Sequence, residues 1–341
     1  MKNKRIILFI TSEQCCTLAS SAKEYLARVP NVLSIILSER EFGSSALNIF
    51  EDFLHRKLKF TAKISEHAQD VRNRVSFDLV PKTDVHYHAK SVTYQKMANV
   101  IERYAPEAIV LSGHKLIAEA IATKAFLRVN TKIVVAPDGY VLNKQYINHF
   151  ADAYLVDNKN MADTLIANGV DEAKITVTGV PTRPCFLSLA EDKNGELSCE
   201  ADKPTLLIAR KRGDKRFDHF RVSTAFNVLD VTDDDKEDLN VYFSCADIIL
   251  TAPCVRTCAK ALVKNKLLVL FGANTHEERL TAEYLSSDFA IYCKSVEEVK
   301  RTLEEFIKQD PAIVEKTELL KHNPTSGAYE AFGSAIAKII G

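Results

Sequence analysis

Three features are missing from this sequence, and each absence excludes a class of protein. Lysine plus arginine and aspartate plus glutamate both number 45, so the formal net charge is zero and we expect no nucleic-acid partner. No apolar run reaches the roughly 18 residues needed to cross a bilayer. The eight cysteines lack paired spacing, and MKNKRIILFI is too short an apolar run for a secretory signal. We therefore expect a cytoplasmic protein with reduced thiols, and any membrane contact to be peripheral, at the inner face.

Short apolar segments alternate with amphipathic segments along the chain. Residues 4–11 are typical of a buried strand, residues 15–28 of a helix and residues 32–37 of a second strand. A chain that opens in this order predicts an α/β fold with parallel sheets. Ligands of such folds bind beyond the carboxyl ends of the strands, so polar residues that directly follow a strand are the candidate site residues.

The stretch from Asp152 to Phe186, DAYLVDNKNMADTLIANGVDEAKITVTGVPTRPCF, marks the end of a domain. It predicts a strand, a helix capped by Asp157 or Asn158, a second strand and a proline-containing exit. The 341 residues suffice for two packed domains. The predicted parts are an N-terminal domain over residues 1–185, a second domain over residues 186–325 and a C-terminal helix over residues 326–341.

These segments resemble the monogalactosyldiacylglycerol synthase and processive diacylglycerol glucosyltransferase family, which is related to the bacterial lipid II N-acetylglucosaminyltransferase. The resemblance runs from about Ala105 to Phe186 and returns more weakly from about Ala246 to Val299. It implies the GT-B fold, in which two Rossmann-like domains face a cleft and the last helix packs back on the N-terminal domain. It also implies transfer of a hexose from a nucleotide sugar (a UDP-sugar) to a lipid or other hydroxyl acceptor, with no cofactor and no metal.

Polar side chains follow two predicted strands of the first domain, in turns that the resemblance places on the acceptor side. Ser112 and His114 follow one strand, and Asp138 and Tyr140 follow the next. A histidine at a helix start has a lowered pKa, and a neutral imidazole exchanges a proton near pH 7. The alternative is that His114 caps its helix and Asp138 binds backbone amides of its own turn.

The first loop, TSEQCCTL, departs from the family pattern. The family has a glycine-rich loop there that ends in a histidine, a candidate general base. Glu13 is the residue of this loop that can take a proton, so we predict it as a third catalytic candidate beside His114 and Asp138. A solvated carboxylate or a helix cap is the alternative interpretation.

The donor side departs further. A basic run replaces the family's glycine-rich turn, and about one βαβ unit, roughly 30 residues, is missing, so we expect a shortened second domain. Cys254 and Val255 replace two glycines, and Lys260 replaces a glutamate that accepts ribose hydroxyls, which an ammonium cannot do. The predicted donor-binding residues are Arg210, Lys211, Arg212, Pro253, Thr257, His276, Glu277 and Glu278. For the basic run, a phosphate clamp and a solvated loop both remain open.

Two further patterns have a functional and a purely structural interpretation. The basic amphipathic segment 44–60 suits either a membrane interface or a core helix with a solvated face. His86 and His88 beside Asp84 lack a third cluster of ligands, which favours a solvated edge over a metal site.

The losses on the donor side leave two functions open: a divergent glycosyltransferase, or an inactive relative that acts as a binding or partner subunit. A nucleotide-sugar epimerase is a third, weaker interpretation.

Overall fold

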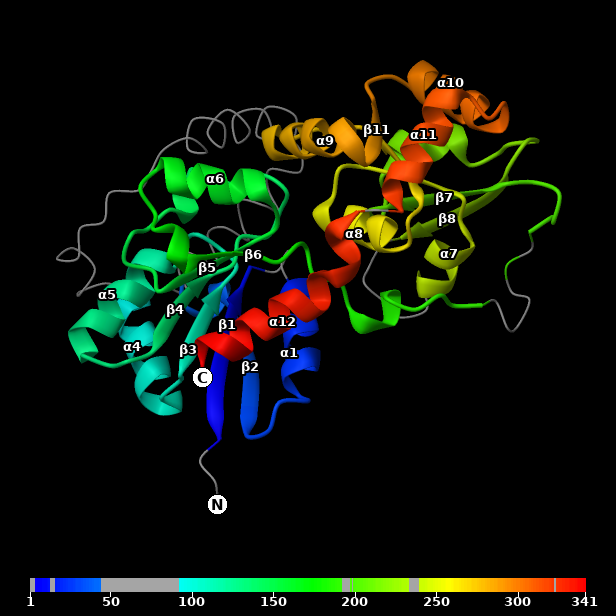
Figure 1. Ribbon diagram of the computed structural model, residues 1–341. Coiled ribbons are helices and arrows are strands. Elements are labelled where there is room, and N and C mark those ends of the chain that lie inside the picture. Colours follow the sequence, from blue (N-terminus) through cyan, green and yellow to red (C-terminus); the bar gives the residue numbers. More distant parts are fainter. Residues whose placement is uncertain are drawn as a thin grey trace. The chain divides into compact units, whose positions relative to one another are not determined.

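The computed structural model describes residues 4–12, 16–43, 92–191, 197, 199–232, 239–321 and 323–341. Glu13, the segment 44–60 and the His86–His88 pair lie outside these residues. The chain divides into two compact units (Figure 1), unit 1 with Met1–Gly179 and Tyr329–Gly341, and unit 2 with Val180–Ala328. The division falls at Gly179 and at Ala328, where the sequence predicted 185 and 325.

Unit 1 contains a six-stranded sheet in the order β2-β1-β3-β4-β5-β6, with every neighbouring pair parallel. The strands are β1 (Arg5–Thr11), β2 (Val32–Ser38), β3 (Ala108–Leu111), β4 (Lys132–Val135), β5 (Ala153–Val156) and β6 (Ile175–Val177). The central strands are short runs of β-branched and aliphatic residues. In β3, every residue is buried. The α/β architecture predicted from the alternation of apolar segments is confirmed.

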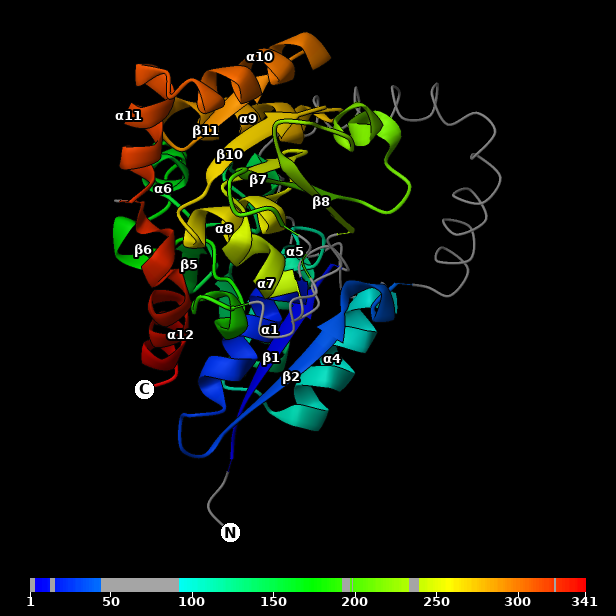
Figure 2. The ribbon, with the colours of Figure 1, turned by 90° about the vertical axis from the view of Figure 1, so that its right-hand side faces the viewer.

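Helices cover both faces of this sheet. One face carries α4 (Val92–Tyr104), α5 (Ile117–Leu127) and α6 (Lys159–Ala167), and the other carries α1 (Cys16–Leu26) and α12 (Ala328–Ile339). Figure 2 shows α1 and α4 on either side of β1 and β2. At Gly333 of α12 a Cβ would lie 2.2 Å from the ring of Tyr25, so this close approach requires glycine. The Tyr25 hydroxyl also lies 2.9 Å from the Ser334 hydroxyl, which fixes α12 on α1.

Unit 2 contains a five-stranded parallel sheet in the order β11-β10-β9-β7-β8. The strands are β7 (Thr205–Arg210), β8 (Asn227–Thr232), β9 (Ile248–Thr251), β10 (Leu267–Phe271) and β11 (Ala290–Cys293). The helices are α7 (Leu239–Cys245), α8 (Val255–Val263), α9 (His276–Asp288), α10 (Val296–Ile307) and α11 (Pro311–Leu320). Between β7 and β8, where residues 211–226 are all described, the crossover holds the 3₁₀ helix η8 (Lys215–Phe220) and no α-helix. Two Rossmann-like domains, the second with this abbreviated crossover, match the predicted fold class.

Candidate functional site

His114 lies at the carboxyl edge of the unit 1 sheet, in the turn that follows β3. Its half-buried ring meets the ring of Tyr146 edge-on, with centroids 5.5 Å apart, and the Tyr146 hydroxyl donates to the carbonyl of Ser112 at 2.9 Å. Burial lowers the pKa of His114, and the charge of Lys115 lowers it further. This lowered pKa favours the neutral imidazole, and its causes are burial and the charge of Lys115 where the sequence analysis invoked a helix dipole. Helix α5 starts only at Ile117, and its N-terminus has no side-chain cap.

The turn after β4 is held by the two residues that follow β5. Oδ2 of Asp157 accepts a hydrogen bond from the backbone N–H of Gly139 at 3.0 Å, and the Asn158 amide donates to the carbonyl of Tyr140 at 2.8 Å. Gly139 has φ of 150°, a value that favours glycine. Asp138 is therefore presented at this edge by a turn whose backbone is fixed from the neighbouring strand.

Asp157 is a site residue that the sequence had marked only as a helix cap. The cap of α6 is Asn158, whose Oδ1 accepts from the Met161 N–H at 3.0 Å. Asp157 is 8% exposed; burial raises its pKa well above the usual range, and the negative charge of Asp138 raises it further. Two carboxyl groups near each other at the end of adjacent strands, one of them prone to hold a proton, are typical of functional sites. The signal in the sequence was the Asp-Asn pair directly after a buried strand.

The predicted residues of this edge differ in access. Ser112 and Tyr140 are buried and support the turns, whereas His114 and Asp138 are half-buried. Because β3 and β4 pair in parallel, the two turns share one edge of the sheet. A further carboxylate from the end of β2, Glu39, reaches the same edge and was not identified from the sequence.

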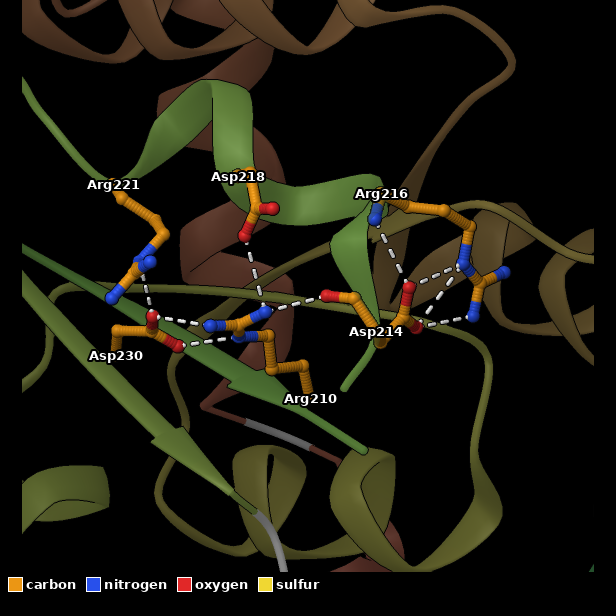
Figure 3. A network of polar contacts seen from close by, with 6 residues as sticks. All are labelled: Arg210, Asp214, Arg216, Asp218, Arg221 and Asp230. Carbon is orange, nitrogen blue, oxygen red and sulfur yellow. Dashed lines mark hydrogen bonds and ion pairs between the residues drawn. The ribbon is translucent and has the colours of Figure 1, made fainter. Parts of the chain in front are cut away.

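On unit 2, Arg210 is the centre of a network of ion pairs (Figure 3). Its Nε and Nη2 donate to the two oxygens of Asp230 at 2.7 and 2.8 Å, and its Nη1 lies 3.3 Å from Oδ1 of Asp218. Asp230 is shared with Arg221, whose Nε lies at 2.7 Å. A bidentate pair of this kind uses the donors that a phosphate would need. Arg210 would have to exchange Asp230 for the ligand.

Arg216 is also ion-paired with an aspartate of unit 2. Its Nε lies 2.8 Å from Oδ1 of Asp214, and its Nη1 donates to the carbonyl of Gly272, tying η8 to the loop after β10. Although burial opposes it, the hydrogen bonds from Arg216 lower the pKa of Asp214. This part of the basic run thus stabilises unit 2 by holding η8 to the loop after β10.

Lys211 and Arg212 are the exposed members of the predicted phosphate clamp. Nζ of Lys211, on a side chain that is 66% exposed, lies 4.0 Å from Oε1 of Glu278 at the start of α9. The Glu278 carboxylate also accepts from the backbone N–H of Thr275 at 3.2 Å and completes a capping box. His276 is half-buried and Glu277 exposed in the same turn. The structure thus brings Lys211 close to the predicted sugar-binding loop.

The residues around α8 face inward. Pro253 and Thr257 are buried, and Lys260 is 1% exposed with Nζ 4.9 Å from the ring centroid of Phe186. A cation over an aromatic face in the interior is a packing contact. Lys260 therefore packs in the core of unit 2 and is shielded from solvent. Within the described ranges, no cluster of three or more histidine, cysteine or acidic side chains is arranged to hold a metal.

Comparison with known proteins supports the resemblance. Residues 39–182 match the family model described as monogalactosyldiacylglycerol (MGDG) synthase, a range that includes both turns at the carboxyl edge of unit 1. The resemblance predicted from the sequence is thereby confirmed over this range. No curated protein sequence matches the chain significantly. None of the helices in the described parts is long and apolar enough to cross a membrane.

Solved structures show the same fold over the whole chain. MurG of Acinetobacter baumannii superimposes with a TM-score of 0.63 at 12% identity, covering 98% of this chain and 99% of that one. The calicheamicin glycosyltransferase CalG4 gives 0.61 at 12% identity, covering 100% and 99%. The UDP-GlcNAc 2-epimerase of Neisseria meningitidis bound to UDP-GlcNAc gives 0.59 at 10% identity, covering 98% and 99%. The GT-B type of fold predicted from the resemblance is confirmed, and at these identities the likeness concerns the fold alone.

Proposed function

We propose that the protein is a divergent glycosyltransferase that transfers a hexose from a UDP-sugar to the hydroxyl of a lipid or of another acceptor. One observation supports this most strongly. The segment that matches the glycolipid synthase model carries His114 and the Asp138–Asp157 pair on one edge of one sheet. A neutral imidazole and an ionisable carboxyl pair are groups that can hydrogen-bond an alcohol and exchange a proton with it.

Each group has a role in this proposal. His114 and Asp138 bind the acceptor hydroxyl and orient its oxygen. Lys211 and Arg212 attract the diphosphate of the donor by charge, and the α9 start, with His276 and Glu277, supplies polar contacts to the sugar. Charge of this kind stabilises a leaving diphosphate without a metal ion. A lipid acceptor implies peripheral contact with a membrane surface, which co-sedimentation with anionic vesicles measures.

A second function, an inactive relative that binds a partner, is favoured by specific contacts on unit 2. Arg210 and Arg216 are held by Asp230 and Asp214, and Lys260 is buried where the family has a ribose-binding glutamate. A binding subunit needs no donor phosphate site. The two functions therefore differ in one measurable property, affinity for the nucleotide.

A thermal-shift titration with UDP, UDP-glucose, UDP-galactose and UDP-N-acetylglucosamine tests the proposal. Ligand at 100 times its Kd adds about 2.7 kcal/mol to the free energy of unfolding. We expect a shift in the wild type that is reduced in Lys211→Ala and Arg212→Ala and kept in Arg301→Ala, which removes an exposed arginine of α10. No shift with any nucleotide at millimolar concentration would leave the binding subunit as the better account. Analysis of the products then separates transfer from epimerisation.

A further inference from the structure

Glu39 is a carboxylate that neither the sequence analysis nor the proposed function uses. It opens the 3₁₀ helix η2 (Glu39–Glu41) directly after β2. This turn is anchored at both ends. The Ser38 N–H donates to Oε1 of Glu41 at 3.0 Å, Lys96 of α4 donates to the Glu41 carbonyl at 2.8 Å, and Phe42 is buried in the core of unit 1. Glu39 therefore stands on a rigid base.

The side chain of Glu39 lies against Gly113. A Cβ at Gly113 would lie 1.6 Å from Oε1 and 2.5 Å from Cδ of Glu39, so this contact exists because residue 113 is glycine. Strand β1 lies between β2 and β3, so the side chain extends across the carboxyl end of β1. It reaches the turn that carries His114, the next residue in the chain. Glu39 thus belongs to the same edge as the acceptor-side residues.

Oε1 of Glu39 is shielded from solvent and has no hydrogen-bond partner among the described residues. A buried carboxylate oxygen without a donor destabilises the ionised group, and uptake of a proton by the carboxylate reduces this cost. Burial raises the pKa of Glu39, and the charge of Lys115 opposes the shift. The other charged groups nearby are Arg40 and Glu41 on η2 and Lys96, whose ammonium is engaged by backbone carbonyls.

We infer that Glu39 is the general base that receives the proton of the acceptor hydroxyl, an assignment that rests on the proposed glycosyltransferase function. The acceptor oxygen attacks C1 of the hexose while its O–H proton passes to the carboxylate of Glu39. A new C1–O bond forms, and the C1–O bond to the nucleoside diphosphate breaks, its electron pair leaving on the diphosphate. Water then removes the proton from Glu39. His114 keeps the role of binding the acceptor oxygen.

The full-length Glu39→Gln variant tests this assignment, with Glu102→Gln, which changes an exposed glutamate of α4 in the same unit, as the matched control. Gln keeps the shape of the side chain but cannot take a proton. We expect kcat to fall about 100-fold or more in Glu39→Gln, with the acceptor KM and the UDP-sugar thermal shift unchanged. Glu102→Gln retains wild-type kcat. Added formate restores part of the activity of Glu39→Ala, a rescue that a structural role does not give.

The pH profile gives a second readout. If Glu39 is the base, wild-type kcat falls as the pH drops through its raised pKa, and this acid limb disappears in Glu39→Gln. Wild-type kcat and profile in Glu39→Gln would overturn the assignment of Glu39 while leaving the transferase intact. A wild-type protein that binds no UDP-sugar and transfers no hexose would overturn both.

Discussion

The carboxyl edges of the two sheets use the same residue types in opposite ways. At the edge of unit 1, Asp157 is buried and Glu39 is half-buried with one oxygen shielded from solvent, and burial raises the pKa of both. At the edge of unit 2, Asp214 and Asp230 lie in a network with arginines, and the pKa of Asp214 is lowered despite its burial. Under-paired carboxyl groups cost stability, whereas well-paired ones hold loops together.

This difference indicates which half of the molecule retains features of a reactive site. Carboxyl groups kept at a stability cost are characteristic of functional positions, because their proton affinity is what the chemistry uses. The arginine–aspartate network of unit 2 instead lies at a crossover without an α-helix, and it ties η8 to β7 and to the loop after β10. Removing a carboxylate should therefore lower the free energy of unfolding at the edge of unit 2, and should remove a loss of stability at raised pH at the edge of unit 1.

The largest effect is expected for Asp230→Ala. The change leaves Arg210 and Arg221, both ion-paired to Asp230, without that carboxylate, and we expect the free energy of unfolding to fall by about 2–4 kcal/mol. Urea denaturation measures it. The control is Glu318→Ala, which removes an exposed pair with Lys321 and should change stability by less than about 0.5 kcal/mol. Equal effects of the two changes would show that the network is no more structural than a surface pair.

An intermediate, pH-dependent effect is expected for Asp157→Asn. Because the folded protein holds the Asp157 proton more tightly than the unfolded chain, its contribution to stability is fully present below the unfolded pKa and is lost as the pH rises through the raised folded pKa. The variant keeps an acceptor for the Gly139 N–H but lacks this loss, which amounts to about 1.4 kcal/mol for each unit of pKa shift. Urea denaturation across a pH series checks it. The exposed Asp171→Asn variant should keep the wild-type slope, and a wild-type slope in Asp157→Asn would contradict the raised pKa.

The smallest effect is expected for Lys260→Met. A methionine fills similar space and keeps the packing on Phe186, so the free energy of unfolding should change by less than about 1.5 kcal/mol. Because the side chain packs on Phe186 inside unit 2, the UDP-sugar thermal shift should match that of the wild type. Loss of that shift in a folded Lys260→Met protein would place the ammonium in the donor site after all.

Local features of the fold were predictable because their cause is local. The strand predicted over residues 32–37 is β2 (Val32–Ser38), and the one predicted directly before Ser112 is β3 (Ala108–Leu111). Apolar runs of this length form strands, but their burial depends on the place of the strand in the sheet: the inner strand β3 is buried, whereas the edge strand β2 is only partly buried. The helix that the sequence predicts over residues 116–127 is α5 (Ile117–Leu127), so only the expectation that His114 stands at its start differs from the structure. The helix begins at Ile117, and His114 stands outside it.

Partners of charged side chains were not predictable, because they come from distant parts of the chain. Nothing local to Arg210 reveals that Asp230 accepts its guanidinium, so the sequence left both a phosphate clamp and a solvated loop open for the basic run. Likewise Glu39 meets Gly113 across the end of a strand.

The sequence by itself determined the α/β class, the strands that form it and the turns in which His114 and Asp138 follow a strand, since these depend on the order of apolar and polar residues. The tertiary structure alone decided which charges are paired and which are not. It buried Lys260 against an aromatic ring, satisfied Arg210 with aspartate and left an oxygen of Glu39 unpaired among the described residues. The physical reason is that a charge is stabilised or destabilised by whatever folding brings within a few ångströms of it, and that is a property of the packed chain.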